Sequence, residues 1–356
     1  MTLSGDLLID LDAIAANWRA LDARSAPEVE TAAVLKADAY GCGAAYVGPA
    51  LARAGASTFF VALPPEGAAL REAVGPEPAI YILNGYPARD PSSPNPSYVT
   101  HALRPVLNSA DQATAWLRDH PGAPCAVHVD TGMRRLGMPA AEFTAEFTAL
   151  GALPDAVRLV LSHYACADEP GHPMNARQRA DFARLTDGLA LPRSLANTGG
   201  ILLGPESHFD LTRAGVGLYG GLPFAGAKPA VTLHLPVLQV RDLAPGETVG
   251  YGATWEAARP SRIATLAGGY ADGLVRAMGN HARAFLDGQP VPLAGRVSMD
   301  LITLDVTDCP TAQPGAMVEL LGPNQTVDDL AAAAGTIGYE ILTSLGRRYT
   351  RRYTGA

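Results

Sequence analysis

A single lysine directly follows an apolar segment near the start of the chain. The stretch AVLKADAYGCGA, residues 33–44, runs from small apolar residues into Lys36 and then into a Gly-Cys-Gly turn. A lysine that is partly removed from water has a lowered pKa, and its neutral amine can attack a carbonyl group and form a Schiff base. Lys36 is therefore a candidate nucleophile. The alternative is a lysine that only extends its ammonium group from a strand end into water.

The place of Lys36 depends on the elements around it. In the first two thirds of the chain, apolar runs alternate with Ala-rich helical stretches. Several runs are nearly continuous, which predicts parallel strands that are buried on both faces. Eight such strand-helix units predict a TIM barrel, with Lys36 at the rim where barrel enzymes hold their catalytic groups. The eight runs are residues 32–36, 58–63, 79–83, 103–108, 125–130, 159–164, 193–197 and 211–220.

The pattern of predicted secondary structure changes at Pro229. Short β-like runs separated by Gly-rich turns then dominate, and a helical pattern returns only near residue 327. This predicts an α/β chain of two domains, a barrel over residues 1–228 and a mostly β domain over residues 229–356. The opening segment reads as a strand followed by a helix capped by Asp12, and this strand is a candidate partner of the second domain's sheet.

Composition excludes several classes of protein. The 356 residues are 48% hydrophobic and 17% charged, and the apolar runs are too short to span a membrane, which argues against a disordered or membrane protein. The net charge is -8, and the basic run RRYTRR near the end is interpreted as a solvated tail or a subunit contact, so we expect no nucleic-acid partner. The lack of a signal peptide and of any C-x-x-C pair predicts a cytoplasmic protein with reduced thiols and no metal site.

The segment VLKADAYGCG around Lys36 resembles the pyridoxal-phosphate attachment motif of the alanine racemases. The resemblance continues through DTGMRRLG (130–137), SHYACADEP (162–170), ANTGG (196–200), LTRAGVGLYG (211–220), VGYGATW (249–255) and GRVSMD (295–300). It implies a barrel followed by a β domain, the cofactor pyridoxal 5'-phosphate (PLP), and two-base interconversion of L- and D-alanine. It also implies a homodimer with shared active sites.

The resemblance implies a set of residues around the cofactor. Lys36 would hold PLP covalently and act as one of two bases. Arg213 would contact the pyridine nitrogen, and because a guanidinium stays charged it cannot give that nitrogen a proton, which limits side reactions. His163 would support Arg213, and Arg135 would lie near the ring hydroxyl and the substrate carboxylate. The remaining implied contacts, mostly to the phosphate, are Tyr40, Asn197, Thr198, Gly215 and Val216.

A second group of residues is implied on the substrate side. Tyr251 resembles the second base, which acts on the face of the α-carbon opposite Lys36. Two bases are needed because one base that returns a proton to the same face regenerates the same enantiomer. Met299, Asp300 and Tyr270 resemble the substrate-binding residues, and family geometry takes Tyr251 and Met299 from the partner subunit.

The chain departs from the family pattern at several positions. His128 stands where many members have a lysine that can be carbamylated, and an imidazole cannot form that carbamate. Near the C-terminus, either Arg347 or Tyr349 replaces a family tyrosine on the phosphate side. Cys42 replaces a common histidine outside the chemistry.

Two other functions remain open at this point. A decarboxylase acting on ornithine, lysine or arginine shares the barrel and the lysine, but it relies on an acid at the ring nitrogen, which Arg213 does not supply. A non-catalytic PLP carrier is a single barrel and lacks the residues after Pro229. An alanine racemase itself could supply D-alanine for peptidoglycan or serve alanine catabolism.

Overall fold

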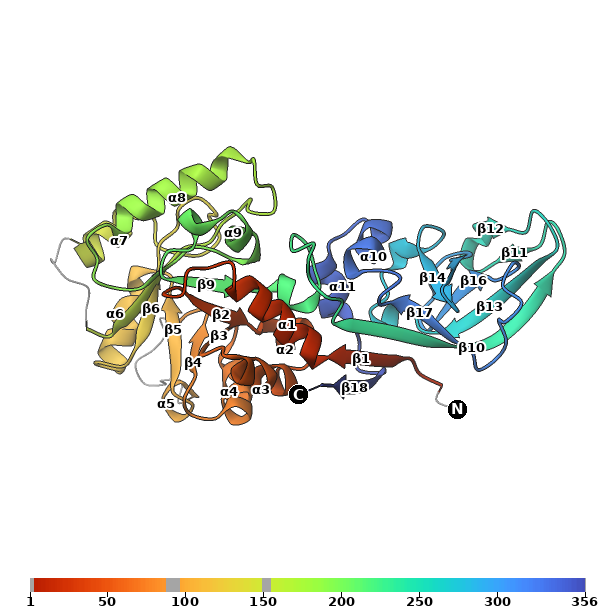
Figure 1. Ribbon diagram of the computed structural model, residues 1–356, viewed down its shortest axis with the longest axis horizontal. Helices are drawn as coiled ribbons and strands as arrows, with labels where there is room; N and C mark the ends of the chain where they lie inside the picture. The colour runs from red at the N-terminus through yellow and green to blue at the C-terminus, as the bar shows by residue number, and fades with distance from the viewer. Residues whose placement is uncertain (1–2, 88–96, 149–154, 356) are drawn as a thin grey trace. The chain divides into compact units, whose positions relative to one another are not determined.

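Eight parallel strands form one sheet in the computed structural model, which describes residues 3–87, 97–148 and 155–355 (Figure 1). The strands are short and mostly buried along their length, as expected when both faces of a sheet are covered. Their order is β8-β7-β6-β5-β4-β3-β2-β9. The strands are β2 (Glu30–Val34), β3 (Thr58–Val61), β4 (Ala79–Ile82), β5 (Leu103–Leu107), β6 (Cys125–His128), β7 (Val157–Leu161), β8 (Arg193–Ser194) and β9 (Leu211–Ala214).

The last strand closes this sheet into a barrel. β9 pairs in parallel with β2, and on its other side Arg213 N donates to Ala196 O at 2.9 Å just beyond β8. Asp210 N donates to Arg193 O at 3.0 Å, so both neighbours of β9 are hydrogen-bonded to its backbone. The predicted TIM barrel is therefore confirmed, and all eight predicted strands form it. Lys36 lies two residues beyond the end of β2.

Helices follow most of the barrel strands, and local signals in the sequence explain where some begin. Ser109 Oγ accepts from Gln112 N at 3.2 Å and caps α6, while two prolines fill the first turn of α4, where a missing N–H costs little. The helices are α3 (Ala44–Ala54), α4 (Pro64–Val74), α5 (Ser97–Thr100), α6 (Ala110–Asp119), α7 (Ala140–Phe143), α8 (Pro173–Thr186) and α9 (Thr198–Leu202). Three other helical turns are η1 (Thr144–Thr148), η2 (Pro205–Ser207) and η3 (Val216–Tyr219).

The chain divides into two units, which we name the barrel unit and the C-terminal unit. The barrel unit comprises Ala15–Ala39 and Gly43–Leu218. The C-terminal unit comprises Met1–Ile14, Tyr40–Cys42 and Tyr219–Ala356, so it includes the start of the chain as well as its end. Within the described residues, none of the helices is both long and apolar enough to cross a membrane.

A mostly antiparallel sheet forms the core of the C-terminal unit, as predicted for a mostly β domain (Figure 1). Its central strand, β10, pairs first with β1 and β17 and then, from Val237 onward, with β13. β1 also pairs in parallel with β18, so both ends of the chain lie in this sheet. The strands are β1 (Asp6–Asp10), β10 (Val231–Leu243), β13 (Ser261–Ala267), β14 (Arg283–Leu286), β15 (Gln289–Pro292), β16 (Leu301–Asp305), β17 (Met317–Leu321) and β18 (Thr350–Thr354).

Short elements complete the C-terminal unit. The strands β11 (Thr248–Val249) and β12 (Trp255–Glu256) form a separate two-stranded sheet. The helices are α10 (Val327–Ala334) and α11 (Gly338–Ser344), and the short turns are η4 (Tyr251–Ala253), η5 (Tyr270–Asp272) and η6 (Arg276–Met278).

The cap of the first helix differs from the prediction. Helix α1 (Leu11–Asp22) follows β1 without a loop, and Asp10 Oδ1 accepts from Ala13 N at 2.9 Å. The predicted cap, Asp12, lies inside the first turn. The reason is that the cap is the last extended residue before a helix, and β1 continues to Asp10.

Candidate active site

Lys36 is a half-buried lysine at the rim of the barrel. The backbone just before it still belongs to the sheet, since Leu35 N donates to Phe60 O at 2.8 Å. Burial lowers the pKa of the Lys36 amine, and the positive charges of Arg135 and Arg213 lower it further, while Glu66 opposes them. A lowered pKa increases the fraction of neutral amine, which is the nucleophilic form.

The residues after Lys36 form a left-handed turn, labelled α2 (Lys36–Tyr40). Ala37, Asp38, Ala39 and Tyr40 have φ values of 53°, 55°, 55° and 54°. None of them is glycine, and the left-handed conformation costs an L-residue roughly 1–2 kcal/mol. Such a run persists only where surrounding contacts impose it. Two carboxylates do so here, because Glu66 Oε1 accepts from Ala37 N and Asp38 Oδ1 accepts from Ala44 N, both at 2.7 Å.

Arg213 is a buried cation whose hydrogen-bond partners are neutral. Its Nη1 donates to Ser194 Oγ at 2.5 Å, and its Nη2 donates to Ser162 O at 2.6 Å and to His163 Nδ1 at 3.2 Å. Burial lowers the pKa of Arg213 to about 10, which still leaves it charged at neutral pH. His163 accepts through Nδ1 and is therefore neutral, and burial beside Arg213 holds its pKa well below the usual value.

The tautomer of His128 follows from its neighbour Asn108. The Asn108 amide Nδ2 donates to Leu83 O at 3.0 Å and to Val106 O at 2.9 Å, so its Oδ1 is the acceptor for His128 Nδ1 at 2.8 Å. The proton of His128 is thus on Nδ1, and Nε2 keeps a lone pair. Burial and the charge of Arg213 lower the pKa of His128 to about 4. Position 128 therefore holds a neutral hydrogen-bond acceptor and not an anion.

The predicted phosphate-side residues of the barrel unit meet where β8 and β9 end. Gly215 N donates to Thr198 Oγ1 at 2.9 Å, and Asn197 Oδ1 accepts from Gly200 N at 2.9 Å. Because the Thr198 hydroxyl accepts from Gly215, its own proton remains available for another acceptor. Val216 follows at the start of η3. The barrel unit thus brings together Asn197, Thr198 and Gly215.

The predicted substrate-side residues lie in the C-terminal unit and are exposed. The exposed fractions of Tyr251, Met299 and Tyr270 are 70%, 54% and 45%. Two backbone bonds hold the turn at Tyr270 against the turn at Met299: Tyr270 N donates to Ser298 O at 3.0 Å and Ala271 N donates to Met299 O at 2.9 Å. These turns bring Tyr270, Met299 and Asp300 together.

Arg348 is a residue of this region that sequence reasoning missed. Its Nε and Nη2 form a bidentate pair with Asp272 at 2.6 and 2.7 Å, and its Nη1 contacts Asp300 Oδ1 at 2.7 Å. Of the two interpretations of the basic run, a solvated tail or a subunit contact, the solvated tail is wrong, because the run leads into β18 and Arg351 donates to Leu345 O at 3.1 Å. A possible signal was the position of Arg348 just before a strand-like segment.

Tyr40 is the predicted site residue of the C-terminal unit that is buried. Its ring stacks on Tyr219 with a centroid distance of 4.7 Å and lies 6.0 Å from the ring of Tyr339. Burial raises the pKa of Tyr40, so its hydroxyl keeps its proton and can donate it. Of the two C-terminal alternatives, Arg347 is exposed and Tyr349 is buried.

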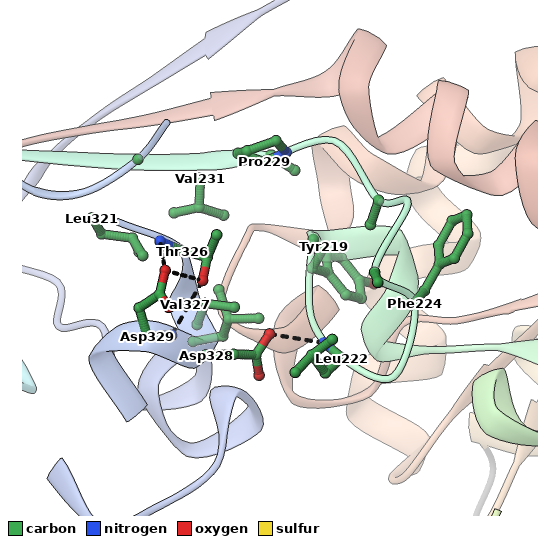
Figure 2. Close-up of a pocket in the computed structure, with 16 residues that line it drawn as sticks. Tyr219, Leu222, Phe224, Pro229, Val231, Leu321, Thr326, Val327, Asp328 and Asp329 are labelled. Carbon is green, nitrogen blue, oxygen red and sulfur yellow. Dashed lines mark hydrogen bonds between the residues drawn. The ribbon is translucent and has the colours of Figure 1, made fainter. Parts of the chain in front are cut away.

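A cavity of about 210 Å³ lies in the C-terminal unit (Figure 2). One wall is the segment from Tyr219 to Val231, and another is the start of α10, where Asp328 accepts from Leu222 N at 2.8 Å. None of the predicted site residues lines it. Over the described part of the chain, no three His, Cys, Asp or Glu side chains form a group that could hold a metal ion.

Comparison with known proteins identifies the family. Residues 9–223 match the model of the alanine racemase N-terminal domain, and residues 230–353 match that of the alanine racemase C-terminal domain. The chain belongs to the alanine racemase family. Two curated alanine racemases, from Jannaschia sp. and Dinoroseobacter shibae, are 54% and 55% identical to it. The first match covers 99% of both chains and the second 98% of both.

Solved structures of alanine racemases share the fold. The alanine racemase from Bartonella henselae, solved with covalently bound pyridoxal phosphate, has a TM-score of 0.92 at 36% identity and is matched over 99% of this chain and 100% of its own. The biosynthetic alanine racemase from Pseudomonas aeruginosa has a TM-score of 0.91 at 38% identity, with the same coverage. Both domains of the alanine racemase fold are therefore present here.

Proposed function

We propose that this protein is a PLP-dependent alanine racemase that interconverts L- and D-alanine. One observation carries the proposal within this family. Lys36, at the family's attachment motif, has a half-buried amine whose pKa is lowered by burial and by two arginines. A lowered pKa increases the fraction of neutral amine, which is the form that attacks an aldehyde.

The residues of the rim fit an aldehyde that carries a phosphate. Arg135 and Arg213 give the surroundings of Lys36 positive charge, which favours an anionic group. Thr198 has a hydroxyl proton to donate. We assign the phosphate to Thr198, Asn197, Gly215, Val216 and Tyr40, the ring nitrogen to Arg213, and the ring hydroxyl to Arg135.

Two bases on opposite faces of the alanine α-carbon then invert its configuration. PLP, when bound, withdraws electrons from the α-carbon and makes its proton acidic. The Lys36 amine holds or returns that proton on one face, and the Tyr251 hydroxyl does so on the other. Arg213 would hold its charge near the ring nitrogen without donating a proton to it, which would keep the electron demand moderate and favour reprotonation over side reactions.

We further propose a homodimer in which Tyr251, Tyr270, Met299 and Asp300 of each chain complete the site of the other. Exposure supports this, since Tyr251 and Met299 present 70% and 54% of their surface in the isolated chain. Large exposed apolar side chains that cluster mark interaction surfaces.

The cytoplasm, where alanine is available, is the proposed location of the protein. Its proposed use is either to supply D-alanine for peptidoglycan or to serve alanine catabolism.

The chain offers a sharp test of the attachment site, because it contains only two lysines, Lys36 and the exposed Lys228. Purified protein reconstituted with PLP should interconvert L- and D-alanine, and borohydride reduction should fix one label per chain on Lys36. A Lys228→Arg variant should keep both properties, and a Lys36→Arg variant should lose both. A label on Lys228, or an active Lys36→Arg variant, would contradict the proposal.

A further inference from the structure

Glu66 connects helix α4 to the turn that follows Lys36. Its Oε1 accepts from Ala37 N at 2.7 Å, and its Oε2 accepts from Ala62 N at 2.8 Å and from Leu63 N at 3.1 Å. Three backbone N–H groups thus share one carboxylate. The resemblance to the family assigns no role to this residue.

The two oxygens of Glu66 have separate effects. The Oε2 bond to Leu63 closes the start of α4, since Glu66 is the third residue after the N-cap Leu63, where a Glu or Gln side chain commonly returns to the cap. The Oε1 bond goes instead to Ala37, 29 residues earlier in the chain. This second bond is not needed to begin the helix, so it requires another explanation.

Helix α4 provides a rigid base for the carboxylate. A Cβ atom on the next residue, Gly67, would lie 2.8 Å from Ile82 Cδ1 and 3.0 Å from Leu103 Cδ2, so the helix backbone packs closely on the neighbouring strands. Pro64 and Pro65 restrict the first turn as well. The carboxylate is therefore fixed relative to the barrel strands.

The turn after Lys36 depends on contacts of this kind. Ala37, Asp38 and Ala39 have positive φ values, which L-residues avoid, so without restraint their backbone would return to the ordinary regions. Glu66 holds the start of the turn at Ala37 N, and Asp38 holds its far end through Ala44 N. The Ala37 N–H belongs to the peptide group that joins Lys36 to Ala37, so its bond to Glu66 fixes the backbone from which the Lys36 side chain extends.

We propose that Glu66 is a positioning residue for Lys36, because its bond to the Ala37 N–H holds the left-handed turn and so directs the Lys36 amine toward the reacting carbon. This inference rests on the proposed function. Glu66 also supplies negative charge near Lys36 and partly offsets Arg135 and Arg213 in setting the pKa of the amine.

Glu66→Gln separates the closing of the start of α4 from the bond to Ala37. An amide has one acceptor oxygen, and the side with two donors, Ala62 and Leu63, retains it, while the NH2 group faces the Ala37 N–H. The helix start is then kept and the bond to Ala37 is lost. Glu72→Gln is the matched control, since Glu72 lies exposed on the same helix.

The first readout needs no cofactor. In PLP-free protein, hydrogen exchange resolved to single amides should be at least about tenfold faster at Ala37 in Glu66→Gln than in Glu72→Gln, with Leu63 unchanged and the same thermal midpoint. Faster exchange at Leu63 with Ala37 unchanged would show that Glu66 only begins the helix, and would overturn the inference.

The second readout uses the reconstituted enzyme. The kcat of Glu66→Gln should fall about 10²-fold with little change in KM for alanine, because a displaced base slows proton transfer more than it weakens binding. Equal kcat values in the two variants would overturn the inference. If the unaltered protein carries no PLP on Lys36, the proposed function fails instead, and the exchange at Ala37 still reports on the contact.

Discussion

The barrel rim and the exposed turns of the C-terminal unit hold their site residues in opposite ways. Arg213 is only 3% exposed, and it is hydrogen-bonded to Ser194, Ser162 and His163, which all belong to the barrel unit. Tyr251 is 70% exposed and lies on a three-residue turn. One half of the proposed site is therefore preorganised within a single unit, while the other half consists of exposed side chains.

The two regions also differ in how they hold charge. The hydrogen bonds of Arg213 named above go to neutral groups, so none of these partners neutralises its charge. Arg348 is paired with Asp272 and Asp300, and these carboxylates raise its pKa above the usual range. We therefore interpret the charge of the rim as attracting a ligand, and that of Arg348 as holding two turns together.

The largest expected effect comes from a substitution at Tyr251 in the exposed turns of the C-terminal unit. Tyr251→Phe removes the hydroxyl of the proposed second base and should reduce racemisation by about 10²- to 10⁴-fold in both directions, with PLP binding unchanged. Rates measured from L- and from D-alanine test this. Tyr46→Phe, also at an exposed tyrosine, is the control and should behave like the unaltered enzyme. Full activity in Tyr251→Phe would remove this residue from the chemistry.

A smaller effect should follow from loosening the turns around Asp300. Arg348→Lys keeps the charge but cannot make the bidentate pair with Asp272 and the bridge to Asp300 together. We expect the KM for alanine to rise about tenfold, with a smaller change in kcat and an unchanged PLP spectrum. Arg259→Lys, at an exposed pair with Asp308, should change neither constant. Equal KM values in the two variants would argue that Arg348 has no positioning effect.

The smallest effect concerns stability at acid pH. The pKa of His128 is about 4 in the folded chain against 6.5 ordinarily, so between these values the unfolded chain binds the extra proton. Neutral His128 therefore contributes roughly 1–3 kcal/mol to the free energy of unfolding above pH 6.5. This contribution is lost as the pH falls toward 4. In urea unfolding at fixed protein concentration, the free energy of unfolding should fall less between pH 7 and 4.5 in His128→Asn than in the unaltered protein. An identical pH dependence in both proteins would contradict the assigned neutral tautomer.

Much of the fold could be predicted from the sequence. The barrel strands are apolar runs whose length and continuity fit strands buried on both faces, and Lys36 stands out because it follows such a run. The cap of α1 was wrong by two residues, since the pattern does not show where the strand ends and the helix begins.

The missed contacts depend on tertiary structure. Arg348 meets partners 76 and 48 residues away in the chain, and a run of basic residues does not reveal them. Glu66 reads as a helix-capping residue, and its second contact exists only because the turn at Ala37 adopts a conformation that L-residues avoid. The neutral state of His128 follows from the two carbonyl groups that orient Asn108.

We propose that the barrel rim of one chain works with the exposed turns of another, and complementation tests this arrangement most directly. Lys36→Ala and Tyr251→Ala proteins should each be inactive alone. In a mixed dimer one site carries both substitutions and the other carries neither, so dissociating and reassociating the two proteins should restore about half of the normal activity per mixed dimer. If mixed dimers form and remain inactive, Lys36 and Tyr251 act within one chain, and the account is contradicted.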